Sequence, residues 1–105
     1  MLSITGGARI GWLNATWPMA KLIVQPSRID LIVKSIGNYS FAKDQVISLN
    51  KYTVFPVIGR GIKIEHIIPE YPKKIIFWTL DNPESIILQI QETGFLPDPD
   101  TFIIS

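Results

Sequence analysis

The stretch that decides the fold spans residues 73–95 and reads KKIIFWTLDNPESIILQIQETGF. Its first third is an apolar run rich in β-branched and aromatic residues, which favours a buried strand. A helix is expected after this strand, because Asp81 or Asn82 can cap its first turn and Pro83 suits its first position. Gly94 is a typical helix stop. The stretch therefore predicts a strand, a turn and a C-terminal helix.

Everything before this stretch reads as short strands separated by turns. Apolar runs and alternating patterns predict strands within residues 4–14, 16–25, 28–34, 39–41, 46–54 and 62–66. The turn at Pro26 and Ser27 joins two of them as an antiparallel hairpin. Pro18 would break a strand ladder unless it lies at a strand start or an edge, and Pro56 should end the fifth strand. The expected fold is mainly β, with about seven strands and one helix that covers the sheet.

The composition describes one folded domain. Of the 105 residues, 47% are hydrophobic and 18% are charged, which excludes a disordered chain. Cysteine is absent, so disulfides and thiolate sites are excluded. We expect residues 1–95 to form the domain and residues 96–105 a tail. The start of the chain lacks the pattern of a signal peptide and the apolar runs are too short to span a membrane, so a cytoplasmic protein is expected.

Charge is distributed unevenly along the chain. Residues 1–80 carry ten basic and four acidic side chains, whereas residues 81–105 carry five acidic and no basic ones. Such a dipole can steer an anionic ligand towards the strand loops, although two solvated faces would give the same pattern. Nucleic acid is not expected as a partner, because no basic cluster is interleaved with aromatic residues.

The sequence offers little material for catalysis. His66 is the single histidine, and no Ser and Asp spacing accompanies it, so its place after Ile62 and Ile64 predicts a core-facing side chain bonded to backbone. A single histidine with scattered carboxylates makes a poor metal site. We therefore expect no enzyme activity, no metal and no cofactor. A small enzyme remains the third alternative, and it requires a pocket that joins His66 to a carboxylate.

The strand order resembles that of the pleckstrin-homology superfold, including its small bacterial members. The residues that carry the resemblance are WPMAKLIV at 17–24, IDLIVKSIGNYSF at 29–41, GIKIEH at 61–66, and IIFWT at 75–79 with the following helix. The resemblance implies a seven-stranded antiparallel barrel or sandwich capped by one C-terminal helix, used for protein or lipid-headgroup contact. The loop near residues 14–18 lacks the basic residues of lipid-binding members. An ordinary antiparallel sandwich with one helix is the alternative fold.

Two sets of residues are candidate binding sites. The first hypothesis is a module that binds a protein partner or itself through apolar side chains that do not fit the buried faces, or that stand beside a turn or in the tail: Trp17, Ile32, Leu88, Phe102 and Ile103. Burial of Trp17 in the core, or packing of the tail over Leu88, is the structural alternative. The second hypothesis is peripheral binding of anionic lipid headgroups by Arg9, Lys21, Lys43, Arg60 and Lys63, which requires these side chains to converge.

Overall fold

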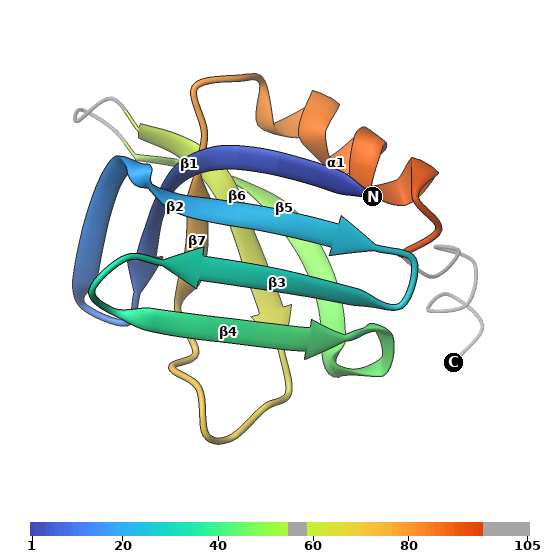
Figure 1. The fold of residues 1–105 in the computed structure, drawn as a ribbon, viewed down its shortest axis with the longest axis horizontal. Helices are drawn as coiled ribbons and strands as arrows, with labels where there is room; N and C mark the ends of the chain where they lie inside the picture. The colour runs from blue at the N-terminus through green and yellow to red at the C-terminus, as the bar shows by residue number, and fades with distance from the viewer. Residues whose placement is uncertain (55–58, 96–105) are drawn as a thin grey trace.

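The computed structural model describes residues 1–54 and 59–95, and these form one curled antiparallel sheet with one α-helix (Figure 1). The strands are β1 (Leu2–Ile10), β2 (Leu13–Gln25), β3 (Arg28–Val33), β4 (Gly37–Ala42), β5 (Val46–Val54), β6 (Gly59–His66) and β7 (Ile75–Trp78). A 3₁₀ turn, η1 (Lys43–Gln45), joins β4 to β5, and α1 (Pro83–Glu92) follows β7. The prediction of a mainly β fold with a C-terminal helix is confirmed.

The strand order is β4-β3-β2-β1-β7-β6-β5, so the first strand, β1, pairs with the last strand, β7. The sheet curls into a half-barrel, and α1 packs against β5 and β6 (Figure 1). Phe41, Phe77 and Phe95 are the largest fully buried side chains. Three distant parts of the chain therefore meet in one core.

The first hairpin differs from the sequence-based expectation. β1 ends at Ile10 and β2 begins at Leu13, so the turn falls at Gly11, which has a φ of +63° and suits the left-handed region. The β1–β2 register then jumps from Gly6↔Ala20 to Ala8↔Ala15. This bulge leaves the part of β2 around Pro18 unpaired with β1, which is how a proline is tolerated inside a long strand.

The deciding stretch folds as predicted, with one difference. Asn82 Oδ1 accepts a hydrogen bond from the Glu84 amide at 3.0 Å, and Gly94 has a φ of +92° after the last helical turn. The expected strand, however, stops at Trp78. Thr79 Oγ1 accepts from the Asp81 amide at 3.0 Å and turns the chain there, so Leu80 lies outside the ladder and is 68% exposed. The expected end of the fifth strand at Pro56 lies outside the described residues.

Candidate interaction surface

Apolar side chains gather on the solvent-facing side of β2 and β3. Trp17 is 53% exposed and Ile32 is 37% exposed, and Met19 is exposed with them. We call Trp17, Met19 and Ile32 the β2 strip. Ile32 lies outward because Leu31 and Val33 face the core, and the side chains of a strand alternate between faces. Of the predicted partner-binding residues, Ile32 therefore lies on this surface, and Trp17 is exposed two residues before Met19, ahead of the part of β2 that pairs with β3.

Basic side chains border the β2 strip. Lys21 pairs in register with Ile32, and the Lys34 amide donates to Met19 O at 2.9 Å. A shallow depression of about 440 Å³ is lined by Thr5, Pro18, Met19, Ala20, Lys21, Ile32 and Lys34. The surface thus combines an apolar floor with two cations. Sequence reasoning missed Met19 and Lys34, because only the β2–β3 register places them beside Ile32.

The other predicted partner-binding residues do not join the strip. Leu88 is 58% exposed on α1, where Ile86 and Ile90 are buried, so its predicted place off the apolar stripe is confirmed. The helix packs against β5 and β6 rather than against β2 or β3. Phe102 and Ile103 lie outside the described residues. Leu88 therefore belongs to a separate surface.

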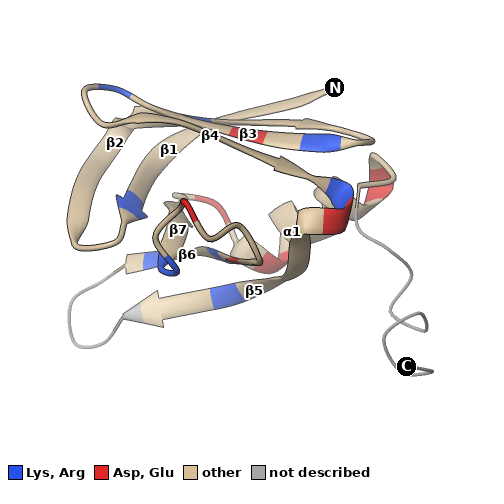
Figure 2. Cartoon of the chain, turned by 90° about the horizontal axis from the view of Figure 1, so that it is seen from below, with Lys and Arg blue, Asp and Glu red and all other residues tan. Residues whose placement is uncertain are grey.

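The predicted anion-binding residues converge only in part. Arg9 and Lys63 each pair in register with Ile76, so the two cations flank this side chain on the outer face, with Cα atoms about 10 Å apart. Lys63 also forms an ion pair with Glu65 at 3.1 Å. Basic residues lie on both halves of the sheet rather than in one cluster (Figure 2).

The remaining three members of that set are separated from this pair. Lys21 borders the β2 strip, and Lys43 lies in η1 between β4 and β5. Arg60, at the start of β6, donates from its guanidinium to Leu80 O at 3.0 Å. The five residues therefore do not form a single binding site.

The turn between β1 and β2 is held by the side chain of Arg9 and by the backbone of Lys74. Arg9 Nε donates to Gly11 O at 2.9 Å, and the Gly11 amide donates to Lys74 O at 2.8 Å. Trp12 at this turn is 85% exposed. We call Trp12, Arg9, Lys73 and Lys74 the hairpin tip. Sequence reasoning missed Trp12 as a surface residue and both lysines, because the β1–β7 pairing alone brings residues 9–12 beside residues 73–74.

Both ring nitrogens of His66 contact backbone groups. Its Nε2 lies 2.8 Å from Pro72 O, and its Nδ1 accepts from the Ile68 amide at 3.0 Å, so the predicted backbone bonding is confirmed. Its ring packs against Phe41 of the core with centroids 5.4 Å apart. Within residues 1–54 and 59–95, no group of three or more His, Asp or Glu side chains is arranged to hold a metal ion.

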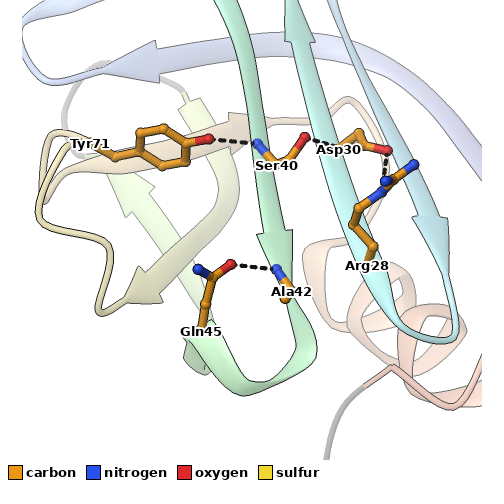
Figure 3. Close-up of polar contacts among 6 residues, drawn as sticks. All are labelled: Arg28, Asp30, Ser40, Ala42, Gln45 and Tyr71. Atoms are coloured by element: carbon orange, nitrogen blue, oxygen red, sulfur yellow. Dashed lines mark hydrogen bonds and ion pairs between the residues drawn. The ribbon is translucent and has the colours of Figure 1, made fainter.

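The outer edge of β4 is covered by side chains (Figure 3). Tyr71 Oη accepts from the Ser40 amide at 3.1 Å, and Gln45 Oε1 accepts from the Ala42 amide at 2.8 Å. Both amides point away from β3, towards the place that a further strand would occupy. This edge is therefore protected against pairing with another chain.

Comparisons with protein-family models, with curated proteins and with solved structures found no match to this chain. In the part of the chain that the structure describes, no helix is long and apolar enough to cross a membrane.

Proposed function

We propose that this chain is a non-catalytic module of the pleckstrin-homology-like kind, which binds a protein partner or a second copy of itself through the β2 strip. The curled antiparallel sheet and its C-terminal helix support the resemblance. The observation that carries the proposal is that Met19 and Ile32 are exposed and line one depression, with Trp17 exposed two residues before Met19. A contiguous exposed apolar patch is typical of a contact surface.

The chemistry of the strip defines the partner that fits it. Tryptophan and methionine are enriched at the centres of interfaces, where a few apolar anchors contribute most of the binding energy. Lys21 and Lys34 border the apolar floor. A partner that presents an apolar side chain flanked by carboxylates would therefore match both the shape and the charge of this surface.

Site-specific photo-cross-linking tests the proposal. A photoreactive residue at position 32 reports on the strip, and the same residue at position 88 reports on the exposed but separate surface of α1. We expect a discrete cross-linked protein, or a cross-linked dimer of this chain, from position 32 and not from position 88. Equal labelling from both positions, or none from position 32, would contradict the proposal.

The hairpin tip favours a second function, contact with an anionic membrane surface. A tryptophan that is 85% exposed suits the interface between lipid headgroups and acyl chains. Arg9 Nε is held at this turn by Gly11 O, and the ammonium of Lys74 lies over the ring of Tyr52, 5.9 Å from its centroid. Each cation near an anionic surface contributes about 1 kcal/mol. This group replaces the scattered five residues as the candidate lipid-binding site.

Co-sedimentation with liposomes tests the second function. We expect binding to anionic vesicles that weakens as salt rises, and a loss of at least tenfold in affinity for the double variant K73Q/K74Q. Lys43→Gln is the matched control, because Lys43 lies in η1 rather than at the tip. No binding to anionic vesicles, or an equal loss in the control, would remove the membrane function and leave the β2 strip as the working site.

A further inference from the structure

His66 holds both ends of the segment that follows β6. Its Nδ1 accepts from the Ile68 amide at 3.0 Å, two residues along the chain, and its Nε2 lies 2.8 Å from Pro72 O, six residues along. A backbone N–H can only donate, so Nδ1 must carry a lone pair. The neutral ring then has its proton on Nε2 and donates it to Pro72 O. Both bonds exist together only while the imidazole is neutral.

The segment between these two bonds carries Tyr71. Its ring packs edge-on against Tyr39 and Phe41 of β4, with centroid distances of 5.2 Å and 5.5 Å. Its hydroxyl oxygen accepts from the Ser40 amide and so covers the β4 edge (Figure 3). The position of Tyr71 therefore depends on the segment that His66 holds.

Because the side chains packed around the imidazole are mostly apolar, protonation of the imidazole itself is the simplest way to change these two hydrogen bonds. Phe41 of β4 contacts the ring, and Val46 of β5 pairs with His66 in register; both side chains are apolar. Tyr71 is the titratable side chain that packs against the ring, at 6.0 Å between centroids. On β6 itself, Glu65 precedes His66 and is paired with Lys63.

We propose that His66 is a pH-sensitive clamp of residues 67–72. A proton on Nδ1 turns the acceptor of the Ile68 amide into a second donor, so that hydrogen bond is lost and two N–H groups face each other. Acid then loosens the segment and withdraws Tyr71 from Ser40. The β4 edge, closed at neutral pH, exposes an amide that another strand can use.

Amide hydrogen exchange in the whole chain tests the clamp. Protection factors of the Ile68 and Ser40 amides, corrected for the intrinsic effect of pH on exchange, are compared at pH 7.5 and pH 5. We expect both to fall at least tenfold in acid, while the Ile90 amide in α1 keeps its protection. Unchanged protection at Ile68 between pH 7.5 and pH 5 would overturn the proposal. An equal fall at Ile90 would also overturn it, because that would report global unfolding.

Two variants distinguish loss of the hydrogen-bond acceptor at position 66 from protonation of the imidazole. His66→Asn keeps a side-chain oxygen near the place of Nδ1 but cannot titrate in this range, so its Ile68 protection should not depend on pH. His66→Ala removes the acceptor, so its Ile68 protection should be low at both pH values. A pH dependence in His66→Asn equal to that of the wild type would contradict the clamp.

The tautomer of the His66 imidazole provides a further test in the wild-type chain. Imidazole nitrogen chemical shifts of the wild type at pH 7.5 should show an unprotonated Nδ1 and a protonated Nε2. The opposite tautomer would overturn the proposal, because Nδ1 could not then accept from Ile68.

Discussion

At the scale of single residues, side chains form hydrogen bonds with backbone groups that the helix and the strands leave unpaired. Asn82 caps the first turn of α1, Thr79 closes the turn after β7, and Gln45 covers the last amide of β4. Among the described residues, no buried side-chain nitrogen or oxygen lacks a hydrogen-bond partner. The sequence predicted a cap at Asp81 or Asn82, because such a residue before Pro83 is a local pattern, and the structure has it at Asn82. The contact of Tyr71 with Ser40 spans 31 residues and has no local signal.

Removing the helix cap should measurably weaken the fold. We expect Asn82→Ala to lower the free energy of unfolding by about 1 kcal/mol, because the Glu84 amide loses its acceptor. Ser85→Ala, at an exposed position in the same helix, is the control and should change it by less than about 0.5 kcal/mol. Urea unfolding measures both, and equal values would show that Asn82 does not act as a cap.

An exposed ion pair with Lys51 lowers the pKa of Glu84. Lys51 Nζ lies 2.8 Å from Glu84 Oε1, and this hydrogen bond, with the charge of Lys51, holds the pKa of Glu84 below its usual value. A lowered pKa in the folded state adds stability above the unfolded pKa, and that stability is lost as the pH falls through the folded pKa. We expect Lys51→Met to return the pKa of Glu84 towards its usual value in an NMR titration. An unchanged pKa would mean that the ion pair does not persist in solution.

At the scale of elements, local patterns predicted the strands and the helix but not how β1 and β2 meet. The strand runs, the stop at Gly94 and the stripe of Ile86 and Ile90 are set by residue type and period. The bulge that accommodates Pro18 is set by the partner strand, and a single sequence does not display pairing. The early end of β7, which exposes Leu80, likewise depends on a side-chain bond of Thr79.

Close contact between β6 and β7 requires glycine at position 61. A Cβ on Gly61 would collide with the carbonyl oxygen of Phe77, whereas a Cβ on Gly59 would lie 3.5 Å from the ring of Trp78, an ordinary contact. We expect Gly61→Ala to lower the free energy of unfolding by about 2 kcal/mol, in the range of overpacked sites. Gly59→Ala should change it by less than half as much. Thermal or urea unfolding checks the pair, and equal effects would contradict the close approach.

At the scale of the whole molecule, topology decides which candidate residues meet. Strand alternation predicted the outward position of Ile32, and the β2–β3 register adds Met19 and Lys34 to it. The scattering of the five predicted cations could not be foreseen, because it depends on which strands are neighbours. The β1–β2 register places Lys21 beside Thr5 and Arg9 beside Asn14, and the β1–β7 pairing brings the turn after Arg9 to the backbone of Lys74.

We propose that the apolar side chains of the β2 strip serve contact with a partner rather than folding. The most direct measurement is the free energy of unfolding of the double variant M19Q/I32T, compared with that of Val33→Thr. Val33 is the inward neighbour of Ile32 and is 2% exposed. Val33→Thr places a hydroxyl in the core and should cost about 2 kcal/mol.

We expect M19Q/I32T to change the free energy of unfolding by less than about 1 kcal/mol, as is usual for surface positions. Its cost should remain clearly below that of Val33→Thr. A decrease in the free energy of unfolding of about 3 kcal/mol or more in M19Q/I32T would contradict a role of the β2 strip in partner contact, because the strip would then be part of the packed structure.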